Sequence, residues 1–337
     1  MSREKEVLLA FSGGIDSCAA VEILQSWGYR VHLFTIDMIG DEAMLSQARL
    51  SAERLGLELH TEDGRELFER EIIDNFTSEY LKGRTPAPCT RCNTKIKWEL
   101  LDRKADQMGI FHIATGHYFL ISEHCGHLYA SRGVDPRKDQ SYYLWGVEER
   151  HLMRALTPMG DRIKEDVKAR SEMKKESMGV CFLRGAHYAD YLCERCSEAM
   201  QSGEVTDRNG MVVGHHQGVA RYTIGQRRGD GIPAGSRVVA IDAQRDRVVV
   251  GSNEELFSRT LHLENCHFIN PREVESSECI EVMVRGIGRN PKGYARLDIT
   301  ESGAIVYLLD DMAWAAASGQ PVALYIGDRV VGGGYLI

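Results

Sequence analysis

A glycine-rich turn near the start of the chain has the composition of an anion-binding loop. The residues Ser12-Gly13-Gly14-Ile15-Asp16-Ser17 follow an apolar run and precede apolar residues at helical spacing. A turn between a strand and a helix presents successive backbone N–H groups at the positive helix end, where phosphate binds well. The turn is neither a Walker A loop, since no Gly-Lys-Ser/Thr follows, nor a Gly-x-Gly-x-x-Gly loop. We therefore expect a phosphate-binding loop of another kind.

Cysteines supply the second set of reactive groups. They occupy positions 18, 89, 92, 125, 181, 193, 196, 266 and 279. Cys89 and Cys92 form a C-x-x-C pair in a segment rich in cations, which favour the thiolate and therefore nucleophilic sulfur chemistry. Cys181 lies far along the chain between apolar neighbours, and Cys193 and Cys196 form a second C-x-x-C pair.

Three arrangements of these thiols compete. Two C-x-x-C pairs could hold a structural zinc ion, but the separation of ~15 to 20 residues typical of zinc ribbons is absent. An iron–sulfur cluster, such as [4Fe-4S], could be held by Cys89, Cys92 and Cys181 with one iron site open. Alternatively, Cys92 and Cys181 could form a redox-active pair that passes sulfur as a persulfide. The apolar neighbours of Cys181 also fit a buried, inert side chain, and spacing alone does not choose.

Composition and charge limit the class of protein. The 337 residues are 43% apolar and 27% charged, as in folded proteins with more than one core. The 41 Lys and Arg against 49 Asp and Glu argue against a uniformly basic nucleic-acid coat. However, residues 82–104 carry 7 basic and 2 acidic side chains, so the excess of acid lies elsewhere. Because no apolar run approaches a membrane span and no signal peptide begins the chain, we expect a cytoplasmic protein.

Strands and helices alternate in the part of the chain that carries the glycine turn. Apolar runs predict strands at 7–11, 31–36, 57–61 and 111–115, with helices after the turn and near 43–55, 66–80 and 95–108. This order is typical of an α/β fold with a doubly wound parallel sheet. Ligands of such sheets bind beyond the carboxyl ends of the strands, where the glycine turn and Gly116 would lie.

The last third of the chain has the pattern of β-structure. Asn209-Gly210 indicates a hairpin, and short β-type runs follow, beginning with 218–224. We therefore expect three domains: 1–202, which contains the glycine turn and the reactive cysteines; 203–258, a small central β-rich domain; and 259–337, a C-terminal β-barrel.

The glycine turn resembles the pyrophosphatase loop of the ATP-cleaving family that includes GMP synthetase, argininosuccinate synthetase and the tRNA thiolases. Over nearly its full length the chain resembles the tRNA-specific 2-thiouridylase family. The matching motifs are Phe11-Ser-Gly-Gly-Ile-Asp-Ser17, Gly83-Arg-Thr-Pro-Ala-Pro-Cys-Thr-Arg-Cys-Asn93, Ala114-Thr-Gly-His-Tyr118, Lys138-Asp-Gln-Ser-Tyr-Tyr-Leu144, Gly179-Val-Cys-Phe182 and Tyr222-Thr-Ile-Gly-Gln-Arg-Arg228. The resemblance also implies that residues 1–202 form an adenine nucleotide alpha-hydrolase-like ATP pyrophosphatase (adenylation) domain. It further implies that the β-barrel at 259–337 contacts tRNA.

The resemblance implies an enzyme that thiolates the wobble uridine of tRNA at the expense of ATP. In the family, ATP adenylates the 2-carbonyl oxygen of the base, which makes AMP the leaving group, and Mg2+ neutralises the pyrophosphate. Sulfur arrives from a persulfide-donor protein. Cys181 would carry it as a persulfide, and Cys92 would release or resolve it with a disulfide left behind.

The resemblance also assigns binding residues. The ATP-binding positions are Ala10, Phe11, Ser12, Gly13, Gly14, Ile15, Asp16, Ser17, Ile36 and Gly116. The positions that meet the target base or the tRNA anticodon stem-loop are Ala87, Pro88, Cys89, His117, Lys138, Asp139, Gln140 and Gln320. A base in an anticodon loop is reached by splaying it out of its stack, which requires a pocket formed by loops.

The chain departs from the family pattern at some of these positions. Cys89 stands where many relatives have an Asp that is a proposed acid/base group, and Ala87 replaces the usual Asn. The additional thiol strengthens the alternative of an iron–sulfur-dependent tRNA thiolase. A non-catalytic RNA-binding protein is a further alternative, disfavoured by the intact glycine turn and both candidate cysteines.

Overall fold

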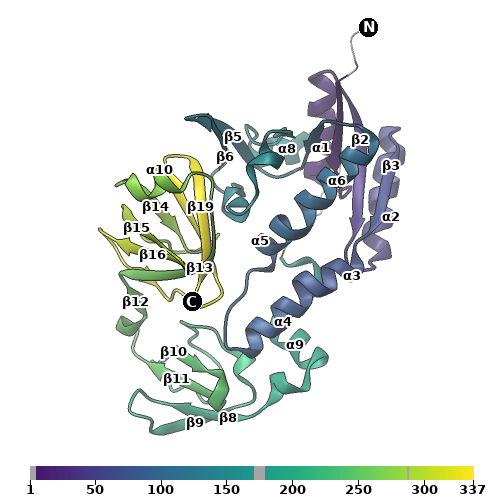
Figure 1. The fold of residues 1–337 in the computed structure, drawn as a ribbon. Helices are drawn as coiled ribbons and strands as arrows, with labels where there is room; N and C mark the ends of the chain where they lie inside the picture. Colours follow the sequence, from purple (N-terminus) through teal and green to yellow (C-terminus); the bar gives the residue numbers. More distant parts are fainter. Residues whose placement is uncertain (1–4, 171–178, 287) are drawn as a thin grey trace. The chain divides into compact units, whose positions relative to one another are not determined.

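The computed structural model describes residues 5–170, 179–286 and 288–337, and the chain forms two compact units (Figure 1). The first unit contains residues 1–72, 89–178 and 328–330. The second unit contains residues 73–88, 179–327 and 331–337. The chain therefore leaves the first unit for 16 residues and returns before Cys89.

A five-stranded parallel sheet forms the centre of the first unit, as the alternation of strands and helices predicts. Its order is β3-β2-β1-β4-β7. The strands are β1 (Lys5–Ala10), β2 (Tyr29–Asp37), β3 (Leu59–Asp63), β4 (His112–Ala114) and β7 (Ala155–Leu156). Val7 pairs with both Val31 and His112, so β1 is central. A hairpin of β5 (Phe119–His124) and β6 (His127–Arg132) follows β4.

Helices cover this sheet and are buried against it. The core on one face joins Val7, Leu9 and Leu33 to α1 (Ile15–Ser26) and α2 (Glu42–Leu55). Leu8 is also fully buried, and alternation along a strand directs it to the other face. A sheet buried on both faces is the doubly wound arrangement expected from the sequence.

Two long helical stretches contain wide turns that the sequence pattern does not reveal. The stretch predicted near 66–80 consists of α3 (Arg65–Phe68), a π-helical turn (Glu69–Ile73) and α4 (Asp74–Leu81). The stretch predicted near 95–108 begins earlier, with α5 (Pro88–Cys92), a π-helical turn (Asn93–Lys97) and α6 (Trp98–Met108). Shorter helices of the first unit are η3 (Ser141–Leu144), α7 (Glu149–Leu152) and α8 (Lys164–Arg170).

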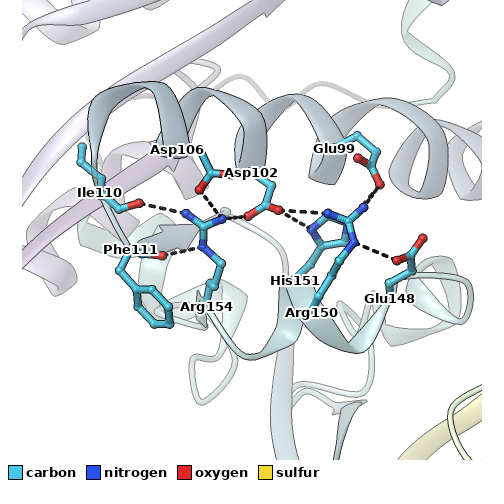
Figure 2. Close-up of polar contacts among 9 residues, drawn as sticks. All are labelled: Glu99, Asp102, Asp106, Ile110, Phe111, Glu148, Arg150, His151 and Arg154. Carbon is cyan, nitrogen blue, oxygen red and sulfur yellow. Dashed lines mark hydrogen bonds and ion pairs between the residues drawn. The ribbon is translucent and has the colours of Figure 1, made fainter.

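A network of charged side chains joins α6 to α7 and to the segment before β7 (Figure 2). Asp102, which is nearly buried, accepts from the guanidinium groups of Arg150 and Arg154. Arg154 also donates to the backbone carbonyls of Ile110 and Phe111, at 2.9 and 2.8 Å. These bonds fix the loop that leads into β4.

The second unit contains a small sheet and a closed barrel. The small sheet has the order β10-β11-β8-β9, with strands β8 (Gly203–Thr206), β9 (Val212–His216), β10 (Arg237–Asp242) and β11 (Arg247–Gly251). The hairpin predicted at Asn209-Gly210 joins β8 to β9. The expected strand at 218–224 is wrong: η6 (Val219–Arg221) and a loop occupy it, because Val219 and Tyr222 enter the core from irregular backbone.

Six antiparallel strands close into the barrel that the sequence predicts near the C-terminus. Their order is β13-β16-β15-β14-β18-β19, and β13 also pairs with β19. The strands are β13 (Thr260–Phe268), β14 (Ile280–Met283), β15 (Ala295–Thr300), β16 (Gly303–Leu308), β18 (Pro321–Ile326) and β19 (Arg329–Leu336). The pair β12 (Phe257–Ser258) and β17 (Ala313–Trp314) forms a separate ladder. Remaining helices are α9 (Tyr188–Arg195), α10 (Pro271–Ser276) and the short η4 (Cys181–Leu183), η5 (Ser197–Met200), η7 (Ala243–Arg245) and η8 (Glu254–Leu256).

Candidate active site

The glycine turn connects β1 to α1 at the carboxyl end of the central strand. Helix α1 starts at Ile15, so the residues Ile15, Asp16 and Ser17 form its first turn. The N–H groups of a first helical turn have no partner inside the helix, and the helix dipole makes this end positive. The Ser17 hydroxyl donates to the carbonyl of Gly14 at 3.0 Å and lies 3.3 Å from Ser12 Oγ, which fixes the loop from inside.

Two glycines pack closely around this loop, and at Gly13 the packing admits no side chain. Gly13 has φ +69°, and an added Cβ would lie 2.7 Å from Ala48 Cα in α2. Its carbonyl accepts from Gln47 Nε2 and Ser51 Oγ, each at 3.1 Å. Gly116, just beyond β4, approaches the loop from the other side, since a Cβ there would lie 3.4 Å from the backbone N of Ser17. The loop is therefore held in a rigid cradle of the kind that a phosphate requires.

The remaining predicted ATP-binding positions adjoin this cradle. Ala10 ends β1, and the buried Phe11 donates its N–H to the Phe34 carbonyl at 2.8 Å. Thr35 Oγ1 donates to the Phe11 carbonyl, which links the loop to the end of β2. The half-buried Ile36 packs against the backbone of Gly64. The structure thus brings all ten predicted positions to one edge of the sheet.

Asp16 carries the strongest polar contacts of the loop. Tyr118 donates its hydroxyl to Asp16 Oδ1 at 2.7 Å, and the ammonium of Lys164 contacts both carboxylate oxygens at 2.6 and 2.7 Å. Sequence reasoning missed Tyr118 as a site residue, although it ends a quoted motif. It also missed Lys164, which lies in an ordinary charged helix 148 positions away from Asp16 and carries no motif of its own.

Cys92 and Cys89 lie on consecutive helical turns of the first unit. Cys92 is buried, and its Sγ lies 3.9 Å from the sulfur of Met38, just past the end of β2. Cys89 is exposed. Burial raises the pKa of the Tyr143 hydroxyl, and the charge of a Cys89 thiolate raises it further. Tyr143 therefore lies near Cys89. A π-helical turn follows Cys92 directly, and such turns are frequent at functional sites.

Some of the cations around these thiols are engaged in ion pairs. Arg91 donates to the carbonyl and the carboxylate of Glu71, and Arg84 pairs with Glu79 and Glu264. Lys95 is exposed, while Lys97 lies close enough to His117 to affect its titration. Arg84 and Arg91 of the basic segment therefore stabilise the local structure through ion pairs, in addition to providing positive charge.

His117 follows Gly116 and remains neutral. Loss of hydration, with a smaller effect of the Lys97 charge, lowers the pKa of His117 to about 3. Its Nδ1 lies 2.9 Å from Thr115 Oγ1, and the tautomer in which Nδ1 accepts leaves an N–H on Nε2. His117 therefore meets a ligand as a neutral imidazole, and its Nε2 donates when Nδ1 accepts from Thr115.

The predicted tRNA-contacting residues Lys138, Asp139 and Gln140 are held beside His117. Gln140 Oε1 accepts from the backbone N–H of Tyr118 at 2.9 Å. Asp139 accepts from the N–H groups of Gly133 and Ser141, at 2.9 and 3.2 Å. Lys138 donates its N–H to the carbonyl of Asp135. These bonds orient the segment, and whether it meets tRNA stays a prediction.

Cys181 belongs to the second unit, where its side chain is exposed. The next residue, Phe182, is buried and packs edge-on against Phe76, with ring centres 5.1 Å apart. Left-handed backbone at Gly179 and Arg184 brackets this short turn. Phe182, and not Cys181, is therefore the residue of this turn that packs into the apolar core. Because Cys181 is exposed, its interpretation as a buried, inert side chain is wrong.

Three further predicted residues of the second unit lie in connected segments. The half-buried Ala87 and the buried Pro88 follow Thr85, whose N–H donates to the Ser318 carbonyl at 2.7 Å. Gln320 lies two residues after Ser318, and its Oε1 accepts from the N–H of Ala317. Thr85 and Ser318, which are 233 positions apart, are thereby joined, as expected if Ala87, Pro88 and Gln320 serve the same ligand.

The other cysteines have local partners or lie outside these groups. Burial raises the pKa of Cys266 to about 11 and also raises that of Cys18. Cys196 donates to Glu198, which raises its pKa, and Cys193 accepts from Arg221. Across residues 5–170, 179–286 and 288–337, no group of three or more His, Cys, Asp or Glu side chains is arranged to hold a metal ion. No helix within the described ranges is long and apolar enough to cross a membrane.

The parallel sheet, the anion loop at its edge and the two β-rich parts define a nucleotide-binding α/β protein with an appended small sheet and a closed barrel. Three family models match in order: the tRNA methyl transferase HUP domain over residues 5–185, its PRC-barrel domain over 189–252, and the aminomethyltransferase beta-barrel domain over 258–336.

Full-length relatives specify the family. The chain is 36% identical to the tRNA-specific 2-thiouridylase MnmA of Desulforudis audaxviator over 98% of both chains. It is 36% identical to the protein of that name from Carboxydothermus hydrogenoformans, over 98% of this chain and 97% of the relative. The tRNA-specific 2-thiouridylase MnmA 1 of Bacteroides fragilis is 35% identical over 100% of this chain and 98% of its own. The chain belongs to the tRNA-specific 2-thiouridylase family.

Proposed function

We propose that this protein is a tRNA-uridine 2-sulfurtransferase that uses ATP to replace the 2-oxygen of the wobble uridine by sulfur. The observation that carries the proposal is the full-length match to relatives with that name, by a chain whose glycine loop forms a rigid anion cradle. The protein would act on the anticodon stem-loop of tRNA in the cytoplasm. We assign residues 1–202 to adenylation, and 203–258 and 259–337 to holding the tRNA.

The loop accounts for the first chemical step. ATP would place its phosphates on the first turn of α1, with Mg2+ neutralising the pyrophosphate that leaves. The 2-carbonyl oxygen of the uridine attacks the α-phosphorus and pyrophosphate departs. Oxide is a poor leaving group from a uracil carbonyl, whereas AMP is a good one, so adenylation makes C2 reactive. The strand-end position of Gly13 and Gly116 supports binding of the nucleotide at this edge.

Two thiols account for the second step. A persulfide-donor protein would load sulfur onto the exposed Cys181 as a persulfide. The Cys92 thiolate attacks Sγ of that persulfide, and the hydrosulfide that leaves adds to C2 and expels AMP. The new Cys92–Cys181 disulfide is returned to two thiols by a cellular dithiol reductant, which supplies two electrons. The exposure of Cys181 suits loading by another protein.

The neutral His117 and the neighbouring polar segment would position the RNA. A donor at His117 Nε2 suits a base or phosphate oxygen, and the segment 138–140 adjoins it through the Gln140–Tyr118 bonds. Cys89, in place of the family's Asp, lies near Tyr143, so these two side chains would share the handling of protons. Positive charge in the basic segment would make tRNA affinity fall with added salt.

The iron–sulfur-dependent thiolase is the second candidate, favoured by the third thiol at Cys89. In that case Cys89, Cys92 and Cys181 would hold a [4Fe-4S] cluster whose open iron carries the sulfide. Anaerobic purification followed by iron and sulfide analysis separates the two mechanisms. If activity requires stoichiometric iron and sulfide, the cluster mechanism is correct and the persulfide mechanism is wrong. Full activity of a protein that contains neither iron nor sulfide supports the persulfide mechanism.

The thiols provide the direct test of the proposal. We expect Cys92→Ser and Cys181→Ser each to lower 2-thiouridine formation at least ~1,000-fold in a reaction with tRNA, ATP, Mg2+ and a persulfide donor, because the nucleophile is lost. ATP affinity should change less than ~2-fold, since the loop is intact. Cys279→Ser, at an exposed position in the barrel domain, is the control and should keep wild-type activity. Full thiolation by either of the first two variants would refute the sulfur relay.

A further inference from the structure

A buried lysine reaches the anion loop from a distant part of the chain. The Lys164 side chain is only 5% exposed, and its Nζ lies 2.6 and 2.7 Å from the two carboxylate oxygens of Asp16. Its backbone N–H donates to the carboxylate of Asp135 at 3.0 Å, which fixes the start of α8. The ammonium also lies 5.8 Å from the centre of the Tyr118 ring, whose hydroxyl donates to Asp16.

The loop itself lacks the charge that a polyphosphate requires. Residues 12–17 contain no Lys or Arg, and their one ionisable side chain is the acidic Asp16. Other phosphate loops carry a lysine that contacts the β- and γ-phosphates. A carboxylate on the first turn of α1 would instead repel the anion that the helix end attracts. A cation must therefore accompany Asp16, and Lys164 is positioned to be that cation.

We propose that Lys164 is the phosphate-binding cation of this ATP site, supplied from α8 rather than from the loop. In the protein without nucleotide, its ammonium neutralises the Asp16 carboxylate. When a polyphosphate occupies the loop, the ammonium turns to the phosphate oxygens, and Mg2+ bound with the nucleotide takes over the carboxylate. This inference rests on the proposed use of ATP and names a binding residue for it.

The proposal predicts effects of opposite sign at the two members of the pair. Without Mg2+, the Asp16 carboxylate competes with phosphate for the ammonium, so removal of that carboxylate charge should strengthen binding. Removal of the ammonium should weaken it. A pair that only stabilises the fold gives a different result, because loss of either partner would then loosen the loop and weaken binding in both variants.

Isothermal titration calorimetry of the full chain with pyrophosphate in EDTA measures this difference. We expect Lys164→Met to weaken pyrophosphate binding about 10- to 100-fold, as for loss of a charge-assisted hydrogen bond. Lys164→Arg should retain part of the affinity. Asp16→Asn should bind metal-free pyrophosphate about 10-fold more tightly than wild type and lose the enhancement by Mg2+. Lys168→Met, exposed one turn further along α8, is the matched control and should bind as wild type.

Each outcome decides between the alternatives. Weaker binding by both Asp16→Asn and Lys164→Met, or wild-type binding by Lys164→Met, would overturn the assignment of Lys164 and leave the proposed function intact. Binding of neither pyrophosphate nor ATP by the wild-type chain would overturn the use of ATP and this inference together. Circular dichroism of each variant identifies a loss of fold, and in that event Lys164→Arg and Asp16→Asn still give the required comparison.

Discussion

At the scale of residues, the site depends on which side chains carry charge and which do not. Asp16 and Lys164 neutralise each other at the mouth of the anion loop. His117, which follows Gly116 just beyond β4, stays neutral because its ring has lost hydration. Cys181 is held at the surface because Phe182 occupies the apolar position next to it. In each case the immediate surroundings of the reactive group determine what it can do.

The neutral state of His117 predicts a pH dependence of stability. Its folded pKa of about 3 is below the ordinary value, so the unfolded chain takes up a proton first as the pH falls through about 6.5. Stability is therefore complete above that pH and is lost below it, by about 2 kcal/mol between pH 7 and pH 5. We expect His117→Asn to lack this loss of stability between pH 7 and pH 5. Urea denaturation of the variant and of the wild type at both pH values measures the difference. The control His124→Asn, at the exposed end of β5, should keep the wild-type dependence, and an unchanged slope in His117→Asn would contradict the account.

At the scale of elements, α6 and α7 hold the loop that leads into β4. Asp102 lies between the two arginines and is 3.5 Å from Nδ1 of the buried His151 (Figure 2). The buried carboxylate of Asp102 is well compensated by these groups. Arg150 is 46% exposed and can reach water without Asp102, whereas the Arg154 and His151 side chains are largely buried. The carbonyls of Ile110 and Phe111 depend on the same Arg154.

This network predicts unequal costs for two neighbouring acids. Asp102→Asn should lower the free energy of unfolding by about 3 kcal/mol, because it leaves the largely buried Arg154 without its buried counter-charge. Asp106→Asn is the matched control, since its carboxylate lies 2.8 Å from the same Arg154 but is 67% exposed. That variant should cost less than ~1 kcal/mol. If guanidinium denaturation gives the same loss of unfolding free energy for both variants, burial of the network does not determine its contribution to stability.

The parts of the fold that follow from local pattern could be predicted from the sequence, and those that follow from distant contacts could not. Hydrophobic periodicity locates β1, β2 and α2, and the Asn209-Gly210 turn locates the β8–β9 hairpin. Periodicity does not locate the π-helical turns, because each covers only five residues and the helical pattern is read over windows of about 11 to 18 residues. Lys164 could not be recognised either, since its role depends on a contact with Asp16 across 148 positions.

At the scale of the whole molecule, the chain divides its predicted chemistry between two interleaved units. The first unit contains the anion loop, Cys89, Cys92 and His117, and the second contains Cys181, Ala87, Pro88 and Gln320. Because residues 73–88 pass through the second unit, the target-base segment is continuous in sequence with the helix that carries Cys92. The proposed reaction therefore requires both units, as the full-length match to the 2-thiouridylases also implies.

Mass spectrometry of wobble nucleosides tests the central claim most directly. In cells from which this protein is removed and no second enzyme of the family remains, we expect 2-thiouridine at the wobble position to disappear and the unthiolated nucleoside to accumulate. The wild-type chain should restore the modification, whereas Cys92→Ser and Cys181→Ser should not. Unchanged 2-thiouridine in cells without the protein would contradict the account.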